Sequence, residues 1–151
     1  FQPRMNEVIS AEAADKMLVL LQGVINDGTG RRIRNTYHIE GEIGGKTGTT
    51  NRHSDAWFIG FTPQLVTGCW VGGDDRDIHF ESMTYGQGSS MALPIWALYM
   101  KKIYSDNTLD YSPDIKFNLP EGYDPCGRGK GGEGESDAKE FDGIDLEEVY
   151  E

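Results

Sequence analysis

The stretch that most constrains what this chain can fold into is Gly-Gly-Lys-Thr-Gly-Thr-Thr at residues 44–50. It places one lysine among three glycines and three threonines. Glycine lacks a Cβ and lets another backbone approach closely, while threonine hydroxyls and a lysine ammonium can bind an anion. This composition favours a segment that holds a carboxylate or a phosphate against an extended main chain.

Two motifs compete for these residues, and the first is the phosphate-binding P-loop. That motif needs a glycine, four further residues and then Gly-Lys-Thr, so its first glycine would stand at position 40. Glu40 stands there instead. A P-loop also leads directly into a helix, whereas the residues after Thr47 are poor helix formers. A P-loop nucleotide binder is therefore only a remote alternative.

The second motif is Lys-Thr-Gly on a β-strand, as found in serine acyltransferases that bind penicillin. Two runs rich in aromatic and β-branched residues follow it, and Pro63-Gln64 separates them, which is typical of a hairpin. We therefore expect an antiparallel meander of three strands, near 43–51, 55–62 and 65–72. A glycine- and threonine-rich strand or turn without chemistry is the remaining interpretation.

Apolar periodicity predicts two amphipathic helices on either side of these strands. Ser10 stands where an N-cap is expected, and apolar residues then recur every three or four positions until Gly28 and Gly30 end the helix. A second helix is expected from Met91 to about Tyr104, because Leu93, Trp96, Ala97 and Met100 share one face. The predicted fold class is α+β, with both helices packed on the meander.

The remaining charged groups suggest no metal or cofactor. The three histidines are scattered, and the aspartates at 74, 75 and 77 do not match a calcium-loop spacing. We predict no metal site and no cofactor. The basic run Arg31-Arg32-Ile33-Arg34 lies close to the lysine motif, and it is interpreted either as a solvated face or as a group that attracts an anionic substrate.

Charge is distributed unevenly along the chain, whose net charge is -11. Residues 121–151 hold eleven acidic and three basic side chains, which leaves residues 1–120 nearly balanced and without a nucleic-acid footprint. We expect a folded part at 1–122 and a disordered, glycine-rich acidic tail at 123–151. Cys69 and Cys126 fall in these different environments, so no disulfide is inferred.

The chain begins at Phe1 and shows neither a signal peptide nor an apolar run of about 18 residues. We interpret it as a piece of a longer polypeptide.

Several motifs together resemble the C-terminal part of the transpeptidase domain of bifunctional, class A penicillin-binding proteins. The resemblance runs from about Val8 to Gly122 and rests on motifs in a fixed order. These are Gly-Thr-Gly-Arg at 28–31, Gly-Lys-Thr-Gly-Thr-Thr-Asn at 45–51, Asp-Ala-Trp-Phe-Ile-Gly-Phe-Thr-Pro at 55–63, Trp-Val-Gly at 70–72 and Ala-Leu-Pro-Ile at 92–95. The resemblance implies that the three expected strands are the last three of a five-stranded sheet and that the domain is incomplete. One sheet edge and one apolar patch should then be uncovered.

The resemblance also implies an activity: cross-linking of peptidoglycan stem peptides by acyl transfer through a serine ester, with β-lactams acylating the same serine. Lys46 would keep the cleft positive and assist proton transfer, and the backbone N–H of Thr49 would be an oxyanion donor. Thr47 and Thr49 would bind the terminal carboxylate of the stem peptide or of the antibiotic, and Thr50 would also contribute to substrate binding. Gly48 would leave the strand edge bare so that the peptide can add to it as a strand.

One departure from the family is large, because the nucleophile motif Ser-x-x-Lys should precede Lys46 and nothing suitable does. Ser136-x-x-Lys139 and Ser105-Asp106-Asn107 match family motifs in letters but follow Lys46, so the order is reversed. We expect this chain alone to be inactive and its parent to be a D-Ala-D-Ala transpeptidase.

The expected partners are the N-terminal remainder of the domain, stem peptides and β-lactams, together with a second copy of this chain bound through the uncovered face. The expected location is the extracytoplasmic, periplasmic side of a bacterial inner membrane, with the anchor outside this chain. A non-catalytic binding or scaffold module of the same fold is the alternative.

Overall fold

The computed structural model describes residues 8–120 and Tyr123. The acidic tail predicted at 123–151 therefore lies outside the described residues except for its first residue. No helix in the described part of the chain has the length and apolar character needed to cross a membrane.

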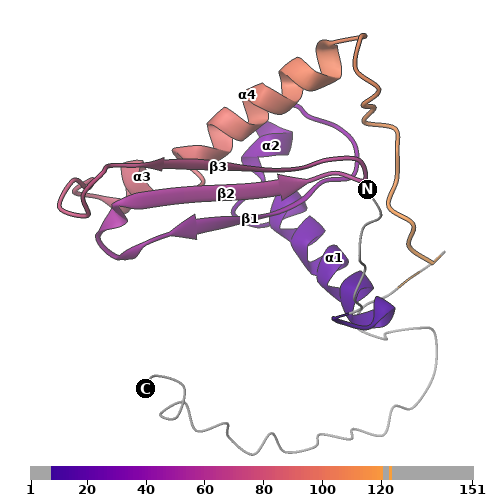
Figure 1. Ribbon diagram of the computed structural model, residues 1–151, viewed down its shortest axis with the longest axis horizontal. Helices are drawn as coiled ribbons and strands as arrows, with labels where there is room; N and C mark the ends of the chain where they lie inside the picture. The colour runs from indigo at the N-terminus through magenta and orange to yellow at the C-terminus, as the bar shows by residue number, and fades with distance from the viewer. Residues whose placement is uncertain (1–7, 121–122, 124–151) are drawn as a thin grey trace, which may run out of the picture.

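The fold is α+β, as predicted, and consists of one three-stranded antiparallel sheet with helices (Figure 1). In chain order the elements are α1 (Ala11–Asn26), α2 (Arg32–Asn35), β1 (Gly44–Thr49), a 3₁₀ turn (Asn51–His53), β2 (Asp55–Phe61), β3 (Val66–Gly72), α3 (Met83–Gly86) and α4 (Ala92–Ser105). The strand order is β1-β2-β3. Among the described residues, β1 and β3 each have one neighbouring strand, so both sheet edges are open.

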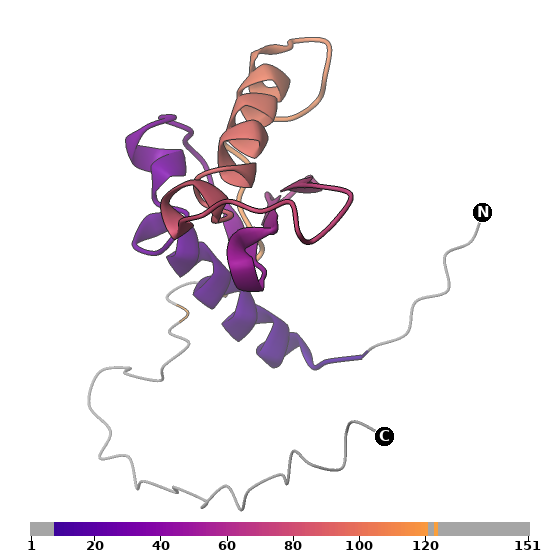
Figure 2. The same cartoon turned by 90° about the vertical axis from the view of Figure 1, so that its left-hand side faces the viewer.

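The register separates the side chains of the sheet into two faces. Gly45 pairs with Gly60, Thr47 with Phe58 and Thr49 with Ala56, so these residues share the inner face. Lys46 pairs with Ile59 and therefore lies on the outer face. The helices α2 and α4 lie beside the inner face (Figure 2).

The hydrophobic core lies between the inner face and the helices. Phe58 and Trp96 meet edge to face with ring centroids 5.3 Å apart. A Cβ on Gly60 would lie 2.5 Å from the Trp96 ring, so this glycine makes room for the indole. The largest fully buried side chains are Trp96, Phe58, Ile25, Ile33, Ile43, Leu93 and Met100.

The outer face of the sheet carries large apolar side chains that remain exposed. Trp57, Ile59, Val66 and Trp70 are 44%, 48%, 70% and 46% exposed. The predicted uncovered apolar patch is therefore present in the described part of the chain.

The helix α1 packs against β1 mainly through its C-terminal end, where Ile25 is fully buried. Its N-terminal part projects away from the sheet (Figure 1), and Met17 and Leu20 are more than half exposed. The expected amphipathic stripe of α1 is therefore only partly covered. The predicted cap is present, since Ser10 Oγ accepts a hydrogen bond from the Ala13 N–H at 3.2 Å.

The segment between α1 and β1 differs from the sequence-based expectation. The basic run forms the short helix α2, which the sequence did not predict. Arg34 donates hydrogen bonds to the carbonyls of Ile39 and Gly41, each at 2.6 Å. Residues 38–43, which connect α2 to β1, do not pair with the sheet. The interpretation of Arg34 as part of a solvated face is wrong, because its charge holds this loop together.

Candidate functional site

The residues Lys46, Thr47 and Gly48 lie within β1, which is an edge strand. After Thr49 the chain continues as extended backbone at Thr50 and then as a 3₁₀ turn. A P-loop would require a helix beginning at the Lys-Thr pair. The P-loop alternative is therefore inconsistent with the structure.

The lysine and the two threonines on either side of Gly48 point to opposite faces of the sheet. The Lys46 side chain is exposed on the outer face, and its Nζ donates to the Thr47 carbonyl at 2.8 Å. Thr47 and Thr49 point to the inner face. A ligand lying along the β1 edge could therefore meet a cation on one side and hydroxyl groups on the other.

The Thr49 hydroxyl is held by a loop distant in sequence, residues 86–90. The Gly88 N–H donates to Thr49 Oγ1 at 3.1 Å. A Cβ on Gly88 would lie 2.3 Å from the Trp57 carbonyl oxygen and 2.7 Å from the Gly48 carbonyl oxygen. The loop therefore packs directly on the backbone of the Lys-Thr-Gly strand, and the same loop leads into α4 through hydrogen bonds from Ala92 and Leu93 to the Gly88 carbonyl.

We expect Gly88→Ala to lower the free energy of unfolding by about 1–3 kcal/mol, because the added methyl overlaps backbone atoms that cannot move independently. Urea denaturation followed by circular dichroism measures this change. Gly23→Ala is the matched control, since a Cβ there meets no atom within 4 Å, and it should be neutral or stabilising by up to about 1 kcal/mol. Equal stabilities of the two variants would contradict the packing described for the loop.

Thr50 belongs to the turn between β1 and β2. Its Oγ1 accepts from the Asp55 N–H at 2.9 Å and lies 2.9 Å from Ser54 Oγ and 3.2 Å from Asp55 Oδ2. The other carboxylate oxygen of Asp55 accepts from Trp70 Nε1 at 3.0 Å. Ser54 Oγ also donates to Asp55 Oδ2 at 3.0 Å. The hydrogen bonds to this carboxylate, above all those from Trp70 and Ser54, hold the pKa of Asp55 below its usual value. The Thr50 hydroxyl thus forms hydrogen bonds within the turn, and its contact with substrate stays a prediction.

The segment between α1 and α2 lies beside β1 on the inner-face side. Thr29 Oγ1 is 3.1 Å from Thr47 Oγ1. Next to this pair is an open cavity of about 480 Å³, lined by Asp27, Gly28, Thr29, Arg31, Arg32 and Ser89. The sequence did not identify Thr29, although it lies in the Gly-Thr-Gly-Arg motif.

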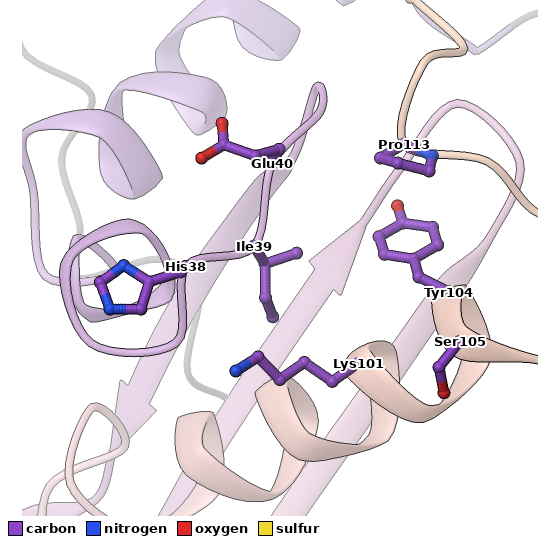
Figure 3. Close-up of a pocket in the computed structure, with 7 residues that line it drawn as sticks. All are labelled: His38, Ile39, Glu40, Lys101, Tyr104, Ser105 and Pro113. Atoms are coloured by element: carbon purple, nitrogen blue, oxygen red, sulfur yellow. The ribbon is translucent and has the colours of Figure 1, made fainter.

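Figure 3 shows a second cavity, of about 330 Å³. His38 and Glu40 line it from the segment before β1, while Lys101, Tyr104 and Ser105 line it from the last turns of α4. Burial raises the pKa of Tyr104. This cavity shares no residue with the Lys-Thr-Gly strand.

Ser105-Asp106-Asn107 lies at the end of α4, where Ser105 Oγ donates to the Lys102 carbonyl at 2.9 Å. Ser136-x-x-Lys139 and Cys126 lie outside the described residues. Cys69 is a free thiol whose pKa is raised by burial. Within the described residues no group of three or more metal-ligating side chains occurs.

Comparison with known proteins identifies the family. Residues 2–72 match the family model for the penicillin-binding protein transpeptidase domain. Residues 2–72 belong to this transpeptidase family. Penicillin-binding protein 1A of Aquifex aeolicus is 40% identical over 118 residues, which are 78% of this chain and 15% of that protein. Penicillin-binding protein 1A of Pseudomonas aeruginosa is 41% identical over 107 residues, 66% of this chain and 12% of that protein.

A solved structure supports the fold of this penicillin-binding transpeptidase fragment. The crystal structure of penicillin-binding protein 1A from Haemophilus influenzae matches with a TM-score of 0.62 and 37% identity. The match covers 75% of this chain and 17% of that chain. The predicted family and the α+β fold are therefore confirmed, and the chain spans only 12–17% of these relatives.

Proposed function

We propose that this chain supplies the Lys-Thr-Gly wall of a peptidoglycan D,D-transpeptidase that acts through a serine ester and binds penicillin. The observation that carries the proposal is the position of the motif on an open edge strand. Such an edge presents unpaired main-chain groups along which a peptide can add as a further strand. Lys46 is exposed beside it.

In this proposal the serine hydroxyl comes from the N-terminal remainder of the domain, which covers the outer face of the sheet. The serine oxygen attacks the carbonyl carbon of the penultimate D-alanine, and its proton passes to a neighbouring base. That base then gives the proton to the peptide nitrogen, so that the C–N bond breaks and the terminal D-alanine leaves with a free amino group. An acceptor amine next attacks the ester carbonyl, forms the new amide bond and returns a proton to the serine oxygen as the ester bond breaks. Lys46 assists the proton transfers electrostatically, and the Thr49 N–H donates to the oxyanion.

The location follows from the same proposal: the parent acts on the periplasmic side of the inner membrane, with its anchor outside this chain. Its partners are stem peptides and β-lactams. No cofactor is required, because the serine ester and its hydrolysis or aminolysis need only proton transfer and charge stabilisation.

Labelling with a fluorescent penicillin tests this function. A protein extended N-terminally through the rest of the domain should form a covalent adduct that survives denaturing electrophoresis, whereas the 151-residue chain should not. An extended protein that folds but remains unlabelled would support the alternative, a non-catalytic binding or scaffold module.

A further inference from the structure

Two glycines shape the turn that brings Thr29 to the Lys-Thr-Gly strand. A Cβ on Gly28 would lie 2.8 Å from Val24 Cα, and one on Gly30 would lie 2.7 Å from Ile25 Cδ1. The chain therefore folds tightly against the end of α1, and the Gly30 N–H donates to the Val24 carbonyl at 2.8 Å. Thr29, between these glycines, is placed so that its Oγ1 lies 3.1 Å from Thr47 Oγ1.

The contact between these two threonines leaves a donor free for a ligand. Each hydroxyl has one hydrogen and can accept two hydrogen bonds. If one hydroxyl donates to the other, the second hydroxyl still has its hydrogen. Both side chains meet at an exposed position, so this hydrogen can be donated to an oxygen atom from solvent or from a bound molecule.

The cavity beside the threonine pair is positively charged. Two guanidinium groups, of Arg31 and Arg32, line it against one carboxylate, that of Asp27. Arg32 Nη1 donates to the Ser89 carbonyl at 3.0 Å, which fixes this side chain to the loop before α4. Within residues 8–120, the Arg31 side chain forms no hydrogen bond or ion pair and is exposed. Arg31 is therefore the guanidinium that is available to a ligand.

We propose that Thr29 and Arg31 complete, with Thr47, a subsite for the carboxylate of the acyl donor. This inference rests on the proposed function, since it concerns the acid end of the peptide or of a β-lactam lying along β1. A guanidinium can bind a carboxylate through two parallel hydrogen bonds, and the free hydroxyl hydrogen supplies a third donor. The Asp27 carboxylate repels a ligand that carries more than one negative charge.

The test compares benzylpenicillin with its methyl ester, which lacks the charged carboxylate, on the N-terminally extended protein. Acylation rates are measured for the parent and for the variants Arg31→Gln and Thr29→Val. Each substitution should slow acylation by benzylpenicillin about tenfold, as expected for loss of a hydrogen bond to a charged group. Acylation by the ester should change by less than about twofold, because the ester does not use the guanidinium.

The comparison between the two ligands separates a carboxylate subsite from general damage to the fold. Misfolding would slow both ligands equally, so an equal loss overturns the inference. Lys102→Gln is the charge control, because it removes one cation from the far end of α4, and it should leave both rates unchanged. If the parent is not labelled at all, the proposed function fails. Suppose instead that the unsubstituted extended protein is labelled and that Arg31→Gln still reacts with benzylpenicillin and its methyl ester in the same ratio as the unsubstituted protein. In that case only the proposed carboxylate subsite is wrong.

Discussion

Replacing Lys46 by alanine in the N-terminally extended protein is expected to slow penicillin acylation by roughly a hundredfold or more, with little change in stability. The size of the effect follows from the contribution of positioned proton-transfer and charge-stabilising groups, typically about 10²–10⁴-fold. Stability should be retained because the Lys46 side chain is exposed and its one described bond is to the neighbouring Thr47 carbonyl. Stopped-flow or gel-based labelling gives the rate, and thermal denaturation gives the stability.

Lys102→Ala provides the matched comparison for Lys46→Ala. It removes an exposed lysine from the last turns of α4 and should leave acylation unchanged. If Lys46→Ala labels as fast as Lys102→Ala, Lys46 has no role in the chemistry. If Lys46→Ala instead unfolds the protein, its role is structural.

The strands could be predicted from sequence because their signals are local. The runs 55–62 and 65–72 contain the aromatic and β-branched residues that favour strands, and a proline separates them. The observed strands Asp55–Phe61 and Val66–Gly72 agree within one residue. The loop between them is closed by the Thr62 N–H, which donates to the Leu65 carbonyl at 2.8 Å.

The parts of the site that could not be predicted depend on contacts between distant segments. The helix α2 has four residues, too short to be stable through propensity alone. It is fixed by Arg34, whose carbonyl partners follow it in sequence, and by Arg32, which reaches Ser89. The bond from Gly88 to Thr49 spans 39 positions and has no local sequence pattern.

The candidate site was predicted only at the level of its motif. Lys46, Thr47, Gly48 and Thr49 were identified because glycine, lysine and threonine at this spacing have a known chemistry. Thr29 lies 18 positions from Thr47 and was not identified, since only the fold of the α1–α2 turn brings the two hydroxyls together. Which faces of the sheet the lysine and threonines occupy follows from the register with β2.

Trp96→Ala is expected to lower the free energy of unfolding by about 3–5 kcal/mol, the largest stability effect in the folded part of the chain. Trp96 is fully buried, meets Phe58 edge to face and fills the space left by Gly60. Its removal leaves a cavity between α4 and the sheet that neighbouring side chains cannot fill completely. Urea denaturation followed by far-ultraviolet circular dichroism measures the loss, since a fluorescence signal would change with the tryptophan itself.

Two further variants show whether the loss comes from the cavity. Leu98→Ala, on the exposed side of the same helix, should cost less than about 1 kcal/mol because Leu98 is 60% exposed. Trp96→Phe should cost less than Trp96→Ala, since it keeps an aromatic ring against Phe58. It also removes a buried Nε1 that has no hydrogen-bond partner within the described residues. If Trp96→Ala lowers the free energy of unfolding no more than Leu98→Ala does, then α4 does not stabilise the inner face of the sheet as described. The loop before α4 would then also not support the Lys-Thr-Gly strand.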